Sequence, residues 1–239
     1  MAGFVAPWRL GEGILASKVD RSMLEKDGVR QAVRDAGHGH LLMPDEQVAA
    51  SLAETMASHP RGQPVWIFGY GSLIWNPLMQ YAERRWARVR GWHRGFYIWS
   101  KVNRGTPDKP GLVLALDRGG SCHGVAYRLH DDERLLDELA ILWRREMVAG
   151  TYMPRWLNAD VGDGIVRAIA FVVNRGKPGY AGRLEEDRIV SIALEAHGAY
   201  GSCADYLTQT AGSLEQQGLP DRRLSRLARM VERAKKGEG

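Results

Sequence analysis

From position 65 onward the chain alternates short apolar runs with polar turn residues, a pattern typical of β-strands. The runs are rich in Val, Ile, Phe, Tyr and Trp and are bounded by Gly, Pro, Asn or Asp. They predict strands over residues 65–68, 86–90, 96–100, 112–116, 122–129 and 165–173. Their close spacing favours a mainly antiparallel sheet or barrel.

Other parts of the chain show the periodicity of helices. Val48, Leu52 and Met56 recur at the spacing of one helix face, and Pro44 suits a first helical turn, so we predict a helix over residues 44–56. Further helices are predicted over about residues 132–148, 186–197, 203–217 and 221–234. Strands followed by helices in this order indicate an α+β fold.

Composition limits the class of protein. The 239 residues are 44% hydrophobic and 26% charged, which suits a globular chain with a sizeable core. No run approaches the roughly 18 apolar residues of a membrane span, and the start, MAGFVAPWRLGEGIL, lacks the pattern of a secretory signal. Two cysteines, Cys122 and Cys203, have no C-x-x-C spacing. We therefore expect free thiols and a cytoplasmic protein.

The formal net charge of +5 allows two interpretations of one basic segment. Residues 83–104 hold seven Lys and Arg against one acid, interleaved with Trp86, Trp92 and Trp99. Such a segment suits a stacking platform for single-stranded nucleic acid. The alternation from Ala87 to Arg90 is equally typical of a strand with one buried face, and this second interpretation is favoured.

A glycine-rich turn is the first candidate site. The apolar run that ends at Phe68 leads directly into Gly69-Tyr70-Gly71-Ser72, whose backbone N–H groups can form a concave nest for an anion. A dinucleotide fingerprint fails because Ile74 stands where its third glycine belongs, and a P-loop fails without Gly-Lys-Ser/Thr. A tight turn with no ligand remains an alternative.

A carboxylate at the end of an apolar stripe is the second candidate. Leu135, Leu139, Leu142 and Glu146 follow the spacing of one helix face, so Glu146 lies at the margin of a core. Burial raises the pKa of such a carboxyl and suits it to proton transfer near neutral pH. The alternative is a structural ion pair with a nearby arginine, for which the candidates are Arg144, Arg145 and Arg155.

Other chemistry has weaker support. His38 and His40 form a GHGH turn without further metal ligands at the required spacing, so we expect no metal site. Ser72 lacks the G-x-S-x-G pattern, and neither cysteine lies in a nucleophile motif.

Six motifs in order resemble the ChaC-type, glutathione-specific γ-glutamylcyclotransferases. They are VWIFGYGSLIWNP (65–77), GWHRGF (91–96), RGTPDKPG (104–111), GVAYRL (124–129), LWRREMVAGTYMPRWL (142–157) and the tail from residue 201 to 227. The resemblance extends over roughly residues 45–230. The first forty residues match nothing in the family pattern.

The resemblance implies a γ-glutamylcyclotransferase-like fold, a small mixed β-barrel flanked by helices. It implies conversion of glutathione to 5-oxoproline and cysteinylglycine without a metal or organic cofactor. We expect residues 1–60 to form an N-terminal helical extension and residues 61–239 a catalytic domain.

The family pattern also suggests roles for particular residues. Tyr70, Gly71, Ser72 and Leu73 match the turn that binds the γ-glutamyl part of the substrate, and Glu146 matches the acid/base. Tyr152 matches an aromatic residue that lines the pocket, and Arg104 matches a candidate for binding a substrate carboxylate. This chain departs from the pattern at Leu112, where the family often has Arg, so no contact from that arginine carries over.

Two other functions stay open at this point. The same fold can cyclise other γ-glutamyl amino acids or amines, and a non-catalytic protein can bind nucleic acid through the Arg/Trp segment. We expect glutathione as the small-molecule partner, no nucleic acid or membrane partner, and a monomer.

Overall fold

A computed structural model describes residues 19–35 and 37–237. Five strands close into a barrel in the order β1-β3-β2-β4-β5, with β1 and β5 parallel and the other long pairings antiparallel. Their bounds are β1 Trp66–Gly69, β2 Glu83–Ser100, β3 Gly111–Arg128, β4 Tyr152–Asp160 and β5 Ile165–Val173. The predicted α+β fold with a small mixed barrel is confirmed.

Two long strands replace four predicted short ones. The runs at 86–90 and 96–100 both belong to β2, and those at 112–116 and 122–129 both belong to β3. Gly91, with φ of 78°, lies opposite Gly119 and Gly120, whose φ values are 104° and 65°, and the register shifts there. Glycines with positive φ thus bend the hairpin at a bulge where the sequence suggested that strands end.

β4 was not predicted from the sequence, whereas β5 was predicted with its observed bounds. β4 contains Pro154 and shows no clean alternation, because its side chains are mostly half-buried. Its extended form is set by continuous antiparallel pairing with β5 from Tyr152 to Asp160. A neighbouring strand, more than local propensity, makes this segment a strand.

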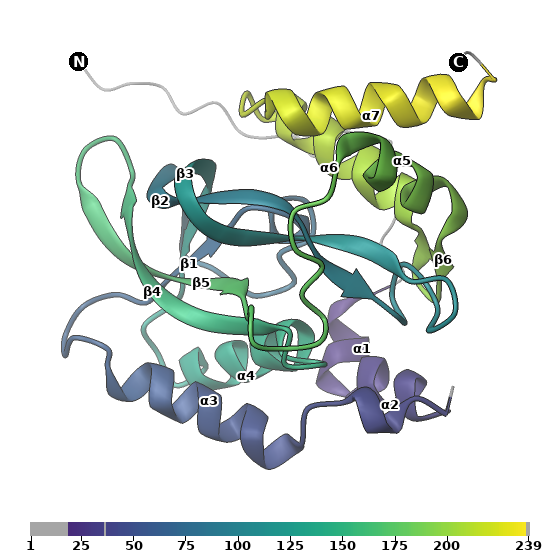
Figure 1. Ribbon diagram of the computed structural model, residues 1–239. Helices are drawn as coiled ribbons and strands as arrows, with labels where there is room; N and C mark the ends of the chain where they lie inside the picture. The colour runs from purple at the N-terminus through teal and green to yellow at the C-terminus, as the bar shows by residue number, and fades with distance from the viewer. Residues whose placement is uncertain (1–18, 36, 238–239) are drawn as a thin grey trace.

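Helices cover the barrel on two sides (Figure 1). The helices α5, α6 and α7 gather on one side, and α3 and α4 lie on the other, near α1 and α2. Their bounds are α1 Arg21–Glu25, α2 Gly28–Asp35, α3 Asp45–Ala57, α4 Leu135–Glu146, α5 Glu186–Glu195, α6 Cys203–Gln216 and α7 Arg222–Lys235. A helical extension was expected over residues 1–60, but α1 and α2 were not predicted as separate helices. Two short antiparallel strands of two residues each, β6 His197–Gly198 and β7 Gly201–Ser202, precede α6.

The main core lies between the barrel and its helices. Leu139, Leu142 and Trp143 of α4 enter it, and the ring of Trp143 meets that of Phe171 edge to face at 5.0 Å between centroids. The predicted apolar stripe of α4 is therefore a core face. Cys122 and Cys203 are buried free thiols, as expected. Within the described ranges no helix is both long and apolar enough to cross a bilayer.

The Arg/Trp segment is a half-buried strand, as favoured from its alternation. Ala87 and Val89 are buried in the barrel, while Arg88 and Arg90 lie on the outer side. Arg88 pairs with Asp160 at 3.1 Å and Arg85 with Asp163 at 2.7 Å. Carboxylates from neighbouring segments therefore neutralise part of this basic surface.

Candidate active site

A cavity of about 390 Å³ opens at one end of the barrel, beside the C-terminus of α4. This volume falls within the range of small-molecule sites, about 300–1,000 Å³. Four of the seven predicted site residues line it: Ser72, Arg104, Glu146 and Tyr152. They come from four separate parts of the chain, so the fold collects them at one place.

Glu146 is the last residue of α4 and the acidic side chain among the described residues that line the cavity. Its side chain is 12% exposed, and Nε of Arg145 approaches Oε1 at 3.1 Å. Burial raises the pKa of the Glu146 carboxyl above its ordinary value, and the charge of Arg145 opposes part of that rise. Both interpretations from the sequence therefore apply: the ion pair exists, and burial still dominates.

Arg145 connects Glu146 to the glycine-rich turn. Its Nη2 donates to Oγ of Ser72 at 2.9 Å, and its Nη1 donates to the carbonyl of Asn76. One guanidinium thus contacts the carboxylate of Glu146, the turn at Ser72 and the segment after it at Asn76, which fixes their relative positions. A bidentate, always charged Arg suits this task because its donors form a rigid planar fork.

Of residues 70–73, only Ser72 lines the cavity. β1 ends at Gly69, and a 3₁₀ helix, η2, runs over Ser72–Ile74. Tyr70 is 6% exposed and donates its hydroxyl to the carbonyl of Phe171, and Leu73 is 5% exposed within the core. Neither side chain lines the cavity, and Gly71 does not line it either.

A buried arginine binds the backbone of this turn. Arg94 on β2 is 8% exposed, and its Nη1 donates to the carbonyl of Tyr70 at 2.6 Å. Its Nη2 donates to the carbonyl of His123 at 2.6 Å, and its Nε pairs with Asp221 at 2.9 Å. Asp221 also caps α7, so this one side chain ties the turn, the barrel and a helix together.

Two tyrosines stand near the acid. Tyr152 of β4 donates its hydroxyl to the carbonyl of Leu114 at 2.7 Å, and the hydroxyl of Tyr206 on α6 accepts from the amide of Leu114 at 3.3 Å. Burial raises the pKa of both phenols, that of Tyr206 to about 12, and the negative charge of Glu146 raises both further. Both therefore stay neutral near pH 7 and can serve as hydrogen-bond donors or acceptors.

Arg104 lies on the loop between β2 and β3. Its guanidinium stands 5.1 Å from the ring centroid of Tyr206, and its Nη1 donates to the carbonyl of Tyr200 at 2.6 Å. Burial lowers the pKa of Arg104, but an arginine stays protonated at neutral pH. The residue is thus a fixed cation that can bind a carboxylate in the cavity.

Sequence reasoning missed the roles of Arg94, Arg145 and Tyr206. Arg145 was considered only as a partner that would make Glu146 structural, and Arg94 only as part of the basic segment. Tyr206 lies in the C-terminal tail, and its helical periodicity indicated a buried face without indicating what that face meets. Only Arg145 carried a local signal, its position next to Glu146.

The site offers no cluster suited to a metal. Throughout residues 19–35 and 37–237, no three His, Cys, Asp or Glu side chains lie close enough to bind one ion. The polar side chains at the cavity are instead cations, hydroxyls, the amides of Asn76 and Asn103, the imidazole of His40 and one carboxyl. This arrangement suits proton transfer and the binding of an anionic compound.

Comparison with known proteins gives the chain its family. The family model described as ChaC-like protein matches residues 65–234. An Escherichia coli protein named glutathione-specific gamma-glutamylcyclotransferase is 43% identical over 182 residues, which cover 76% of this chain and 78% of the relative. The human glutathione-specific gamma-glutamylcyclotransferase 1 is 34% identical over 194 residues, which cover 79% of this chain and 86% of the relative.

A solved structure agrees with the barrel described above. The yeast gamma-glutamyl cyclotransferase specific to glutathione superimposes with a TM-score of 0.65 at 20% identity, over 72% of this chain and 97% of the yeast chain. At this identity the likeness concerns the fold alone. Since the family model extends over well more than half of the sequence, the chain belongs to the family of ChaC-like proteins.

Proposed function

We propose that this protein is a glutathione-specific γ-glutamylcyclotransferase that releases 5-oxoproline and cysteinylglycine. The names of the relatives supply the substrate class, and the geometry of the cavity supports it. One observation carries the proposal: a carboxyl whose pKa is raised by burial lies in a cavity whose other charged side chains are the cations Lys101, Arg104, Arg145 and Lys177. Such a cavity favours an anionic substrate whose own amine must lose a proton.

The reaction forms one carbon–nitrogen bond and breaks another. The α-amine of the γ-glutamyl residue attacks the side-chain carbonyl carbon of that same residue, and a five-membered lactam closes. The bond from that carbon to the cysteine nitrogen then breaks. No electrons are exchanged, so the protein has to fold the substrate, take a proton from the α-ammonium and return one to the leaving amine.

Glu146 is suited to both proton transfers. As a carboxylate it accepts the proton of the α-ammonium, and as a carboxylic acid it then donates to the departing amine. A pKa raised toward neutral makes each direction feasible at physiological pH. Arg145 keeps the carboxylate accessible as an anion and fixes it beside Ser72.

The backbone at residues 70–73 is the candidate site for a substrate oxygen. The first N–H groups of a helix have no partner within that helix, and η2 begins at Ser72. The amide of Ile74 already donates to the carbonyl of Gly71 at 2.9 Å. Ser72 is the residue of this stretch that lines the cavity, so we assign its N–H either to the α-carboxylate or to the oxyanion, with Arg104 and Tyr152 binding elsewhere on the substrate.

The change of Glu146 to Gln tests the proposal. We expect turnover of reduced glutathione, measured as equal amounts of 5-oxoproline and cysteinylglycine, to fall at least about 100-fold, because acid–base catalysis typically contributes about 10²–10⁴. Glutathione binding, measured by calorimetry, is expected to persist. Glu133→Gln, an exposed acid on the segment before α4, is the matched control and should keep wild-type turnover.

Other outcomes would change the conclusion. Unchanged turnover in Glu146→Gln would remove Glu146 from the mechanism. Cyclisation of γ-glutamyl-alanine or γ-glutamyl-lysine with glutathione left intact would keep the reaction and replace the substrate. Loss of binding to single-stranded DNA on changing Trp92 and Arg94 would favour nucleic-acid binding, an option that the internal position of Arg94 argues against.

We also propose a monomer that acts in the cytoplasm. Few large apolar side chains are exposed in the described ranges, and the examples Tyr81, Leu136, Ile165 and Leu194 lie on four different segments. Sedimentation at micromolar concentration should give the mass of one chain; the mass of two would overturn this part of the proposal.

A further inference from the structure

One wall of the cavity comes from a part of the chain that precedes the family-matched region. We call residues 19–35 and 37–42 the N-terminal wall; the match to the family model begins only at residue 65. Six residues of this wall line the cavity: Val19, Val29, Val33, His40, Leu41 and Leu42. The site is thus completed by residues that the family motifs do not include.

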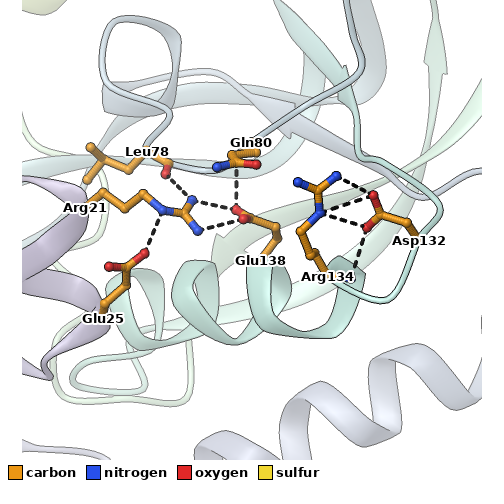
Figure 2. Close-up of polar contacts among 7 residues, drawn as sticks. All are labelled: Arg21, Glu25, Leu78, Gln80, Asp132, Arg134 and Glu138. Atoms are coloured by element: carbon orange, nitrogen blue, oxygen red, sulfur yellow. Dashed lines mark hydrogen bonds and ion pairs between the residues drawn. The ribbon is translucent and has the colours of Figure 1, made fainter.

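An ion pair anchors the wall to α4 (Figure 2). The guanidinium of Arg21 donates to both carboxylate oxygens of Glu138 at 2.8 and 2.7 Å, and also to the carbonyl of Leu78 at 3.1 Å. The side chain of Glu138 is 7% exposed and also accepts from the amide of Gln80 at 2.8 Å. A buried carboxylate with these partners is costly to leave without its cation, so the contact fixes α1 firmly.

Both ends of the wall are tied to residues at the cavity. The side chain of Asn76 donates to the carbonyl of Val19 at 3.2 Å, and directly after the wall the amide of Met43 donates to the carbonyl of Val148 at 2.8 Å. Asn76 and Val148 both line the cavity. The position of the wall is therefore coupled directly to the shape of the space that receives a ligand.

Two buried polar atoms in the same cavity have no partner. These are Nε1 of Trp75 and the hydroxyl of Tyr200, and both residues line the cavity. Trp75 is 9% exposed, and Tyr200 packs on the cluster of Leu24, Val29 and Ile141 that the wall shares with α4. Buried donors are almost always paired in folded proteins. Each of these two atoms has almost no accessible surface, so it pairs with a ligand only after its side chain turns toward the cavity.

We propose that the N-terminal wall, with Trp75 and Tyr200, binds the part of the substrate beyond the γ-glutamyl bond. The inference rests on the proposed function. In glutathione that part holds a second peptide carbonyl and a terminal carboxylate, which are acceptors for an indole N–H and a phenolic O–H. The apolar side chains of the wall cover the rest of the leaving dipeptide. The wall thereby sets the preference for glutathione over shorter γ-glutamyl compounds.

Phe variants test the two donors. Tyr200→Phe removes only the hydroxyl, whereas Trp75→Phe removes the indole N–H together with part of the ring volume. We expect kcat/KM for glutathione to fall about tenfold in each, while kcat/KM for γ-glutamyl-alanine, which lacks the second peptide bond, stays the same. For Tyr200→Phe the melting temperature should hold or rise, because an unpaired buried donor is removed; Trp75→Phe also loses core volume, so its stability is measured separately. Tyr81→Phe, 39% exposed and outside the cavity, is the matched control.

A second pair of variants tests the wall as a unit. Arg21→Ala releases α1 from Glu138, and we expect the KM for glutathione to rise several-fold while kcat is largely kept. Arg134→Ala breaks the exposed pair with Asp132 at the start of the same helix, also drawn in Figure 2, and should leave KM unchanged.

The outcomes separate this inference from the proposed function. If the wild type turns over glutathione and the donor variants lose both substrates equally, or lose stability in parallel, the wall has no role in specificity and the proposed function stands. If the wild type cyclises neither compound, the proposed function fails. Calorimetry with glutathione then tests the wall without turnover: equal affinity for the wild type and Tyr200→Phe would overturn it.

Discussion

At the scale of single residues, the pair of Arg145 and Glu146 determines what the site can do. Burial favours the neutral carboxylic acid, and the adjacent guanidinium favours the carboxylate. With the two effects opposed, the pKa of Glu146 rises, yet the group still ionises. A carboxyl that is fully exposed or fully paired could not both accept and donate a proton near pH 7.

This balance predicts opposite effects of pH on activity and stability. Because Glu146 must be ionised in the free enzyme, kcat/KM should fall as the pH drops through a value above the ordinary 4.5 of a glutamate. The native state binds this proton more tightly than the unfolded state. The contribution of Glu146 to stability is therefore present at low pH and is lost as the pH rises through its folded pKa.

Glu146→Gln should accordingly be more stable than the wild type at pH 8, and the gain should vanish below about pH 4. Urea unfolding at both pH values measures it, with Glu133→Gln as the control. A variant less stable than the wild type at pH 8 would mean that the ion pair with Arg145 outweighs burial.

At the scale of elements, β2 carries two kinds of arginine. Arg85 points outward, is 36% exposed in its side chain and pairs with Asp163. Arg94, nine positions later, is 4% exposed in its side chain and binds two carbonyls and Asp221 inside the molecule. The bulge at Gly91 lies between them. The same strand therefore presents charged side chains to solvent at one end and a buried arginine that binds the turn at Tyr70 at the other.

Replacing each arginine by Met compares these two environments. Arg94→Met leaves two carbonyls and a mostly buried carboxylate without their donor, so we expect the free energy of unfolding to fall by about 2–3 kcal/mol. Arg85→Met removes an exposed ion pair and should cost less than about 1 kcal/mol. Urea denaturation measures both. Equal losses would show that Arg94 does not support the turn at Tyr70.

At the scale of the whole molecule, both thiols are enclosed: Cys122 lies in the cluster formed by the barrel strands, and Cys203 lies in the main core between the barrel and its helices. Cys122 is 3% exposed and Cys203 is 1% exposed, and burial raises the pKa of each to about 11. The thiolate is the reactive form, so both effects suppress reaction. A protein whose proposed substrate is itself a thiol thus keeps its own cysteines away from exchange.

We expect neither cysteine to react with Ellman's reagent within minutes at pH 8 in the native state. Both should react at once in guanidinium, because unfolding exposes them and lowers the pKa to that of a free thiol. The labelling rate of the native protein then reports global opening. Labelling of one cysteine at the rate of free glutathione would contradict the enclosed position.

Much of the architecture could be predicted from local pattern, and the failures are equally specific. The spacing of Leu135, Leu139 and Leu142 predicted a helix face and placed Glu146 at its end, and the run at 165–173 predicted β5 with its observed bounds. Gly91 was interpreted as a strand end because a glycine with positive φ occurs in turns and in bulges alike. β4 escaped prediction because its conformation depends on pairing with β5.

The sequence by itself determined which faces are apolar, where the glycine-rich turn lies and that a carboxyl ends an apolar stripe, since all of these follow from spacing along one segment. Only the tertiary structure decided what these faces meet. It brought Arg104 and Tyr206 to Glu146, turned the side chains of Tyr70 and Leu73 into the core and placed residues 19–35 and 37–42 against the cavity. Periodicity specifies that a face will be buried, whereas the partner that buries it is chosen by packing across the whole chain.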